Sequence, residues 1–350
     1  MNTKQFQNYL LSRRITIALF LNSSDAKKDP AIQYFTGVSP EHALLAIPAR
    51  GVPTLFVTGF EQERLAKQSR IPVRSFSKLS HTMCVLTEKA KLVGVNAANM
   101  ALAERRLIHC RVIDVGEVLK KFRMTKTSQE IEYLTRAARD AGKIFAKTIN
   151  VWKQFKTELD VAGFIASQAF ARGLELSFPS IVACGANAAK PHHEPTRSRL
   201  KGFCVIDFGV KYKGYCSDIT RTVYVGTPSR AEKAVYETVL RAQEAARQHA
   251  CPGVACKELD VIARKNLGVH EKFFTHSLGH GIGVEVHEAP ALSAKSTDIL
   301  QPGMTFTVEP GVYDRSFGIR IEDDCVMTAA GVRVLSSISR NLLVLPKPAR

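Results

Sequence analysis

The sequence lacks the cysteine patterns that build disulfide frameworks or zinc-finger sites. It contains 8 cysteines, but they lie at irregular positions and no two of them form a CxxC pair. They are Cys84, Cys110, Cys184, Cys204, Cys216, Cys251, Cys256 and Cys325. Scattered thiols of this kind are typical of reduced cytoplasmic proteins. We therefore expect free cysteines and a cytoplasmic location.

Long hydrophobic runs are also lacking. The apolar run near the start, residues 15–21 (ITIALFL), is far too short for a bilayer, which takes about 20 apolar residues. No small-residue cleavage site follows it, as a secretory signal would require. We expect no membrane segment and interpret the run as a buried strand.

The chain has no basic tail and no polybasic run, although its net charge is +17 at pH 7. Residues 1–122 hold 18 basic and 9 acidic residues, and the remainder holds 31 and 23, so the excess is spread along the chain. Nucleic-acid-binding proteins usually concentrate such charge in one patch or stripe. No dedicated nucleic-acid function is expected.

The pattern of apolar residues predicts two domains. Residues 1–122 alternate short apolar runs with helical stretches, which is typical of a small α/β domain. Near residue 123 a second domain begins, and Thr127 with Glu130 matches the capping box of a long amphipathic helix. Ser229 with Glu232 predicts a similar helix start. Because its helices come in blocks and its strands in hairpins, we expect residues 123–350 to form an α+β domain.

An internal similarity occurs within the second domain. Residues 202–212 (GFCVIDFGVKY) and 303–313 (GMTFTVEPGVY) both run glycine, apolar strand, acid, one residue, glycine and valine. Asp218 follows Asp207 by 11 residues, and Glu322 follows Glu309 by 13. Two hairpins would each bring a pair of carboxylates together, and a duplicated unit would place all four at one site.

Acids that end apolar strands call for an explanation, because a buried carboxylate must be paired or bound to metal. A single such acid is more often a backbone cap or an arginine partner. Four acids in paired hairpins, near a glycine-flanked histidine at position 280, favour a metal site instead. A cysteine nucleophile is the rival chemistry, since Cys184 lies close in sequence to His192, but nothing in the sequence fixes such a pair.

These motifs resemble, in order and spacing, the dinuclear-metal peptidases of the pita-bread fold, the M24 family. The matching stretches are DFG, SDITRT, GHGIG, VHE, TVEPG and IRIED, and the resemblance covers residues 125–340. The amino-terminal third looks like the extra domain of the prolidase and creatinase branch, which methionine aminopeptidases lack. The resemblance implies a pita-bread catalytic domain (123–350) preceded by a smaller creatinase-type α/β domain (1–122).

The resemblance also implies a set of metal ligands for two divalent ions. They are Asp207, Asp218, His280, Glu309 and Glu322, with Asp218 and Glu322 bridging both ions. Carboxylates and one imidazole suit Mn²⁺ or Co²⁺, and also Zn²⁺ or Fe²⁺. Creatinase, a member of the fold that uses no metal, lacks this full set.

The implied reaction is hydrolysis of a peptide bond by a metal-bound hydroxide, whose pKa two cations lower toward neutrality. Glu309 would relay the proton, and His287 would hydrogen-bond the scissile carbonyl. His192 matches a family histidine near the scissile nitrogen, and His193 is expected to lie behind it or at the surface.

Further residues are expected to contact the ligands rather than the metal. Arg320 would orient the bridging carboxylates, and Thr220 and Arg221 would act similarly. His276 lies four residues before His280, but Gly279 and Gly281 argue against a helix there, so we expect it to be structural or to lie behind the ligands.

The extra domain and the PHHEPT stretch favour hydrolysis of an Xaa-Pro bond at the amino terminus of dipeptides or short peptides. Dipeptidases of this family usually carry an arginine after the HExP motif that anchors the dipeptide carboxylate. Here Ala291 takes that place and Lys295 is the nearest candidate replacement, so aminopeptidase P-like activity on longer Xaa-Pro peptides stays open. A binding module without catalysis is a further alternative, and a homodimer is expected from the resemblance.

Overall fold

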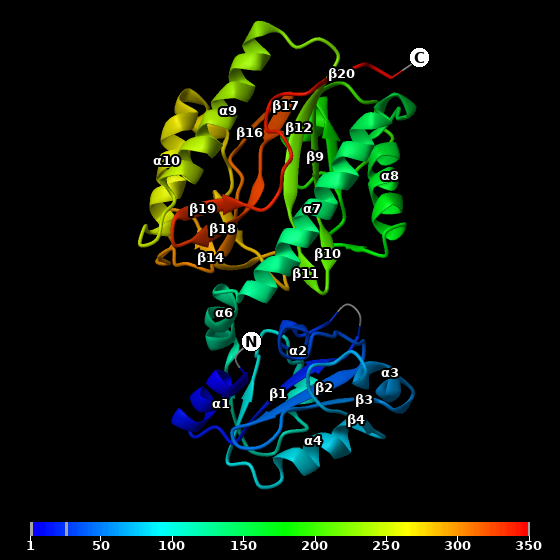
Figure 1. Cartoon of the computed structure of the whole chain (residues 1–350), viewed down its shortest axis with the longest axis vertical. Helices are drawn as coiled ribbons and strands as arrows, with labels where there is room; N and C mark the ends of the chain where they lie inside the picture. The colour runs from blue at the N-terminus through cyan, green and yellow to red at the C-terminus, as the bar shows by residue number, and fades with distance from the viewer. Residues whose placement is uncertain (1–2, 25–26, 349–350) are drawn as a thin grey trace. The chain divides into compact units, whose positions relative to one another are not determined.

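The computed structural model describes residues 3–24 and 27–348. The chain divides into two compact units, residues 1–123 and residues 124–350. Each unit has its own sheets and its own hydrophobic core (Figure 1). Among the described residues, no helix is both long and apolar enough to cross a membrane.

The first unit is built on one mixed sheet with the strand order β4-β3-β2-β1-β5-β6. The strands are β1 (Ile17–Asn22), β2 (Ala43–Pro48), β3 (Thr54–Thr58), β4 (Val73–Phe76), β5 (Leu92–Val95) and β6 (Arg111–Asp114). The helical segments are α1 (Thr3–Ser12), α2 (Pro30–Thr36), η1 (Gly59–Glu61), α3 (Gln62–Ala66), α4 (Leu79–Thr87), α5 (Leu102–Arg105) and α6 (Gly116–Met124). Residues of α1, α2 and α6 cover one face of the sheet, and α4 covers the other.

Two details of this unit differ from a simple βαβ alternation. β1 pairs antiparallel with β2, and β2 with β3, so the centre of the sheet is a meander. The stretch NMALAERRL forms only the short helix α5, because residues 97–101 are held in a turn by Asn96 and Glu104. The predicted strand at ITIALFL is confirmed as the buried β1.

The second unit contains two layers of sheet, each covered by a pair of helices (Figure 1). The helical segments are α7 (Ser128–Asn150), η2 (Trp152–Gln154), α8 (Glu158–Phe170), η3 (Gly185–Ala189), α9 (Arg230–His249), α10 (Cys256–Leu267) and η4 (Gly268–Phe273). The capping boxes predicted at Thr127 and Ser229 are confirmed, and each begins a long helix.

The sheet under α7 and α8 has the order β20-β12-β9-β8, and a small sheet β11-β10-β7 extends it. The strands are β7 (Glu175–Leu176), β8 (Ile181–Cys184), β9 (Gly202–Phe208), β10 (Val210–Tyr212), β11 (Tyr215–Cys216), β12 (Ile219–Val225) and β20 (Val344–Leu345). β9 and β12 run antiparallel, with Asp207 opposite Thr220 and Phe208 opposite Ile219. Asp207 and Asp218 therefore lie at the same end of this pair.

The sheet under α9 and α10 has the order β14-β13-β15-β18-β19. Its strands are β13 (Gly279–Gly281), β14 (Glu288–Leu292), β15 (Thr305–Val308), β18 (Asp323–Thr328) and β19 (Gly331–Val334), and the hairpin β16 (Gly311–Asp314) and β17 (Phe317–Arg320) forms a separate pair. Val308 is paired with Asp323, so Glu309 and Glu322 lie side by side where the ladder ends.

The two halves share one connectivity, which the internal similarity of the sequence predicts. In each half a strand leads to an acid, a short hairpin follows, and a second acid begins the returning strand. The backbone N–H of Glu322 donates to the carbonyl of Thr220 at 3.1 Å. This contact joins the two ladder ends and brings the four acids together.

Candidate metal centre and active site

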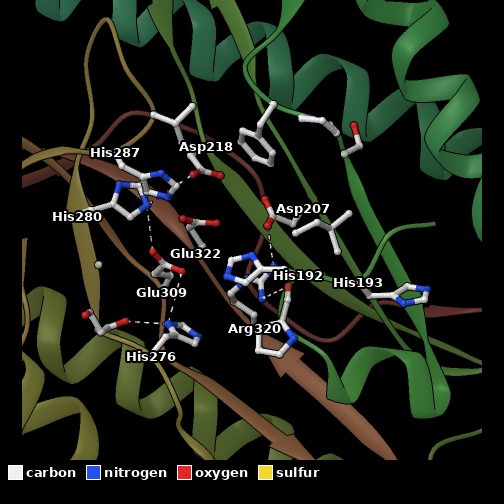
Figure 2. Close-up of a pocket in the computed structure, with 18 of the residues that line it drawn as sticks. His192, His193, Asp207, Asp218, His276, His280, His287, Glu309, Arg320 and Glu322 are labelled. Carbon is white, nitrogen blue, oxygen red and sulfur yellow. Dashed lines mark hydrogen bonds and ion pairs between the residues drawn. The ribbon is translucent and has the colours of Figure 1, made fainter. Parts of the chain in front are cut away.

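A pocket of about 660 Å³ opens where the two sheets of the second unit meet. It is lined by acids, histidines and an apolar wall. The polar lining residues include His192, Asp207, Asp218, His276, His280, His287, Glu309, Arg320 and Glu322. All nine of these residues were singled out from the sequence, and Figure 2 shows their side chains facing the same space.

Three carboxylates are nearly removed from solvent at the base of this pocket, and a fourth is partly exposed. Asp207 is 7% exposed, Asp218 5% and Glu322 1%, and Glu309, whose side chain is 14% exposed, lies beside them just after β15. Asp218, Glu322 and His280 each offer a ligand atom, and these three atoms lie within 4.8 Å of one another. A single cation could therefore contact all three.

Close packing of glycine backbone positions His280. A Cβ on Gly279 would lie 2.2 Å from the carbonyl oxygen of Thr307, and one on Gly281 would lie 2.1 Å from that of Ala289. Only glycine fits at both places, which explains the GHG motif. The His280 Nε2 atom lies 3.2 Å from Glu309 and 3.7 Å from Asp218, so this ring nitrogen points into the carboxylate cluster.

Burial and neighbouring acids raise the pKa of two acids of the cluster, so a bound positive charge would stabilise their ionised forms. Burial, followed by the charges of Glu322, Asp207 and Glu309, raises the pKa of Asp218 well above its usual value. Burial also raises the pKa of Glu322, with the charges of Glu309 and Asp207 adding to it. Among the described side chains, Oδ1 of Asp207 is a buried oxygen without a hydrogen-bond partner.

These observations fit divalent metal ions. Divalent cations supply the charge that keeps adjacent buried carboxylates ionised. An oxygen-rich set with one imidazole also excludes a structural tetrathiolate site. The five residues Asp207, Asp218, His280, Glu309 and Glu322 are thus a chemically suitable ligand set.

Arg320 holds Asp207 in place. Its Nη2 donates to Asp207 Oδ2 at 2.6 Å, its Nε donates to the Thr220 hydroxyl at 3.1 Å, and its Nη1 donates to Tyr313 Oη at 2.7 Å. The prediction from the sequence was contact with the bridging acids Asp218 and Glu322. The structure instead gives direct contact with Asp207 and an indirect link to Glu322, because the Thr220 hydroxyl donates to Glu322 Oε2 at 2.6 Å.

Arg221 supports the site from behind. Its Nη1 donates to the backbone carbonyl of Glu322, and its Nη2 donates to Asp323 Oδ1 at 2.7 Å. Its Nε also donates to the carbonyl of Ser339 at 2.9 Å, which ties the chain after β19 to the back of the site. Thr220 and Arg221 both contact Glu322 rather than the open pocket.

His276 lies beside the ligands on a segment without helix, as the glycines predicted. Its Nδ1 lies 3.9 Å from Glu309 Oε2, and its Nε2 lies 2.8 Å from the hydroxyl of Tyr313. Burial lowers the pKa of this imidazole, and the charge of Glu309 opposes that shift only in part. His276 is therefore held by Tyr313 and by the carbonyl of Ser277, 2.8 Å from its Nδ1, and lies next to Glu309.

The other pocket histidines take different positions. The rings of His287 and His280 meet edge to face with centroids 4.3 Å apart. His192 lies near Asp207 and Arg320, whereas His193 points away from the cluster (Figure 2). The His193 Nε2 atom lies 2.9 Å from Glu158, a carboxylate outside the pocket.

Three residues near the site were missed from the sequence. Tyr313 joins Arg320 to His276, Asp324 accepts a hydrogen bond from the Asp218 backbone N–H at 3.0 Å, and Glu158 holds His193. The IRIEDD stretch contained a signal for Asp324, since three successive acids in an apolar strand cannot all be solvated. Nothing local in the sequence marks Glu158, which looks like an ordinary first-turn acid of α8.

The cysteine alternative gains no support from the geometry. All eight thiols are free, and none of the described cysteines lines the pocket. Burial raises the pKa of Cys216 to about 12 and that of Cys204 well above its usual value. These thiols stay protonated at neutral pH and are poor nucleophiles.

Comparison with known proteins agrees with this site. Residues 132–329 match metallopeptidase family M24, and residues 1–125 match the creatinase/prolidase N-terminal domain. The chain is 35% identical over 322 residues to the Xaa-Pro dipeptidase of Pyrococcus furiosus. The aligned region covers 89% of this chain and 92% of that protein.

Two solved structures are similar over nearly the whole chain. The prolidase from Pyrococcus horikoshii OT3 has a TM-score of 0.90 at 32% identity and covers 98% of this chain and 99% of its own. The X-Pro aminopeptidase from Thermotoga maritima MSB8 has a TM-score of 0.88 at 31% identity and covers 99% and 100%. These matches confirm the predicted pita-bread domain preceded by a smaller creatinase-type domain. The chain therefore belongs to metallopeptidase family M24 and is a hydrolase of that family.

Proposed function

We propose that this protein is a metal-dependent exopeptidase that hydrolyses the Xaa-Pro bond at the amino terminus of dipeptides or short peptides. The observation that carries the proposal is the cluster of four carboxylates, three of them buried, and His280, which faces two further imidazoles, His192 and His287, in one pocket. The relatives named Xaa-Pro dipeptidase, prolidase and X-Pro aminopeptidase support the substrate class.

Asp207, Asp218, His280, Glu309 and Glu322 would hold two divalent cations, with Mn²⁺ or Co²⁺ favoured. Bound there, the cations would lower the pKa of a shared water and polarise the scissile carbonyl. The protein contributes the positions of the charges, since Arg320 and Thr220 fix two of the acids by hydrogen bonds.

Glu309 is suited to accept and pass on the proton of the attacking water. Burial alone would raise its pKa, but the hydrogen bond and charge of His280, together with the charges of His276 and Arg320, outweigh burial and lower the pKa to about 2. It is therefore a carboxylate at neutral pH. The Thr307 hydroxyl, which donates to Glu309 Oε1 at 3.2 Å, helps to hold it in place.

His287 is suited to stabilise the oxyanion that forms from the scissile carbonyl. Burial, then the neighbouring His280, lowers the pKa of His287, so its imidazole is neutral at pH 7. A neutral ring can donate one N–H to the carbonyl oxygen without carrying charge. His192, on the opposite wall beside Asp207, would face the leaving proline nitrogen (Figure 2).

The wall next to His192 suits a pyrrolidine ring. Phe178, Pro179, Ile181 and Pro191 line this pocket and offer apolar surface without a competing donor. A proline residue in a peptide has no backbone N–H. An apolar wall therefore leaves no hydrogen-bond donor of the proline buried without a partner.

A second candidate, an enzyme of longer Xaa-Pro peptides, is favoured by the charges of the pocket. Among the described residues that line it, Arg320 is the one lysine or arginine, and its guanidinium is engaged by Asp207. Ala291 and the acid Glu194 also line the pocket. A dipeptide would bring its free carboxylate close to these groups without a cation partner.

The test loads the protein with Mn²⁺ or Co²⁺ and compares kcat/KM for Xaa-Pro, Xaa-Pro-amide, Xaa-Pro-Yaa and Met-Ala-Yaa. We expect hydrolysis of the proline substrates only. A higher rate for the amide than for the free dipeptide would favour the longer-peptide candidate, because the two substrates differ only in the carboxylate. Activity on Met-Ala-Yaa alone would refute the proposal, and metal uptake far below two ions per subunit would favour a binding module.

A further inference from the structure

The wall of the pocket that carries His192 is an irregular segment, residues 185–200, between β8 and β9. Pro191, His192, His193, Glu194 and Pro195 all line the pocket. After the short η3 turn this segment has no helix or strand, and one turn hydrogen bond, from the His193 N–H to the Lys190 carbonyl at 3.2 Å, spans His192. Contacts from other parts of the fold add the remaining support.

Glu158, the first residue of α8, supplies that support. Its side chain is fully buried, and its two oxygens accept hydrogen bonds from the segment and from Cys184, the residue just before it. Oε1 accepts from the backbone N–H of Cys184 at 2.8 Å and from Asn187 Nδ2 at 3.0 Å. Oε2 accepts from the Thr196 N–H at 3.0 Å, from the Thr196 hydroxyl at 2.8 Å and from His193 Nε2 at 2.9 Å. One carboxylate thus gathers donors from the start, middle and end of the segment.

The carboxylate is ionised in this setting. Burial alone would raise the pKa of Glu158, but the hydrogen bonds from Asn187, His193, Cys184 and Thr196 outweigh it and lower the pKa. The positive end of α8 adds to this effect. Because an ionised carboxylate can only accept, the Nε2 atom of His193 must carry the proton.

The side chains of the adjacent residues His192 and His193 point in opposite directions. The His193 ring turns back to Glu158, whereas His192 faces the carboxylate cluster (Figure 2). The returning chain is also bound to α8, since Leu159 N–H donates to the Thr196 carbonyl at 3.1 Å and Glu158 N–H donates to the Ser198 carbonyl at 3.1 Å. On the pocket side, Arg320 Nη1 lies 3.4 Å from the carbonyl of Pro191.

We propose that Glu158 is a positioning residue of the active site, which holds residues 184–196 so that His192 and the apolar wall face the carboxylate cluster. The inference rests on the proposed peptidase function for its effect on rate. The anchoring itself is a property of the segment and can be measured without any substrate.

The test uses Glu158→Gln in the full-length, metal-loaded protein. The amide keeps the size of the side chain, but its NH₂ group faces donors instead of accepting from them. We expect faster hydrogen–deuterium exchange confined to peptides covering residues 184–198. We also expect kcat/KM for an Xaa-Pro substrate to fall by about 10- to 100-fold, mainly through kcat, because a small misplacement of a catalytic group costs that much. Uptake of Mn²⁺ should be unchanged.

Glu130→Gln is the matched control. Glu130 is also a buried first-turn acid, and it accepts from the Thr127 N–H at 2.9 Å and from the Tyr215 hydroxyl at 2.8 Å, but none of these residues lines the pocket. It should lower the melting temperature and leave kcat/KM and exchange at 184–198 unchanged. Thr196→Val, which removes one hydroxyl donor and keeps the carboxylate, should act like Glu158→Gln but more weakly.

The outcomes separate the two proposals. Unchanged exchange at 184–198 in Glu158→Gln, or increased exchange with wild-type kcat/KM, would overturn the positioning role. If Glu158→Gln fails to fold, Thr196→Val decides by the same two readouts. A wild-type protein that binds metal but hydrolyses no Xaa-Pro peptide would refute the proposed function, while the exchange experiment would still report whether Glu158 anchors the segment.

Discussion

Glu322 and Asp323 are consecutive, fully buried acids whose surroundings are opposite. Burial, followed by the charges of Glu309 and Asp207, raises the pKa of Glu322 well above its usual value. Burial acts on Asp323 as well, but Arg221 and Arg340 outweigh it and lower the pKa. Successive side chains along an extended chain point to opposite sides. Glu322 therefore faces the pocket, and Asp323 faces the donors of Arg221 and Arg340.

The same contrast separates the pocket from the rest of the second unit. Asp323 accepts from Arg221, Gln243, Ser336 and Arg340, and Glu158 accepts from a comparable set, so both carboxylates are satisfied by the protein alone. The pocket acids face one another and have fewer donors: Arg320 donates to Asp207, Thr220 to Glu322, and Thr307 to Glu309, which also lies beside His280. Several buried acids that face one another with few protein donors are thus a better indicator of a metal site than burial itself.

Replacing a pocket acid tests this contrast most strongly. Asp218→Asn or Glu322→Gln should lower kcat/KM by at least about a thousandfold, because ligands that act as a unit fail together. Metal content, measured by mass spectrometry, should fall in parallel. Asp160→Asn is the control. Asp160 lies outside the pocket and accepts from the N–H groups of Lys156 and Thr157 at the start of α8, so its replacement should leave metal content and kcat/KM unchanged. Normal turnover in the Asp218 and Glu322 variants would mean that the ligands are assigned wrongly.

A smaller effect is expected when Arg320, which donates to the pocket acid Asp207, is replaced by lysine. Arg320→Lys keeps the charge but cannot reach Asp207, Thr220 and Tyr313 together. We expect kcat/KM and metal affinity each to fall by about 10- to 100-fold. Arg136→Lys is the control: the exposed Arg136 side chain pairs with the buried Asp140 outside the pocket, so the change should have no effect on either quantity. Wild-type kinetics in Arg320→Lys would show that activity does not depend on the hydrogen bonds by which Arg320 orients Asp207.

Much of the site could be predicted from sequence because its residues sit on regular, local features. Asp207 and Glu309 end apolar strands, and His280 lies between two glycines that only close backbone packing requires. The capping boxes at Thr127 and Ser229 are likewise local patterns, and both begin helices as expected. Local chemistry of this kind can be read without knowing the fold.

The supporting contacts could not be predicted because they join residues distant in sequence. Arg320 reaches Asp207 across 113 positions, and Arg221 reaches Asp323 across 102. Glu158 is an unremarkable first-turn acid until the fold brings residues 184–196 to it. The antiparallel centre of the first unit's sheet is a similar case, since strand direction depends on the connections and not on the apolar runs.

The mildest test concerns the pH dependence of stability in protein freed of metal by a chelator. Burial is the main cause that raises the pKa of Asp324 to about 8, so the folded protein holds this proton more tightly than the unfolded chain, where the pKa is about 3.9. Its contribution to stability is complete below pH 4 and is lost as the pH rises to about 8, at no more than about 1.4 kcal/mol per pH unit.

Asp324→Asn should therefore make the free energy of unfolding, measured in urea, fall less steeply between pH 5 and pH 8. The amide oxygen can still accept from the Asp218 N–H, so the fold keeps this contact. Asp160→Asn should leave the slope unchanged, because the Lys156 N–H lowers the pKa of Asp160 and confines its effect to acid pH. Equal slopes in wild type and Asp324→Asn would place Asp324 with Asp323, among the acids that the protein satisfies by itself.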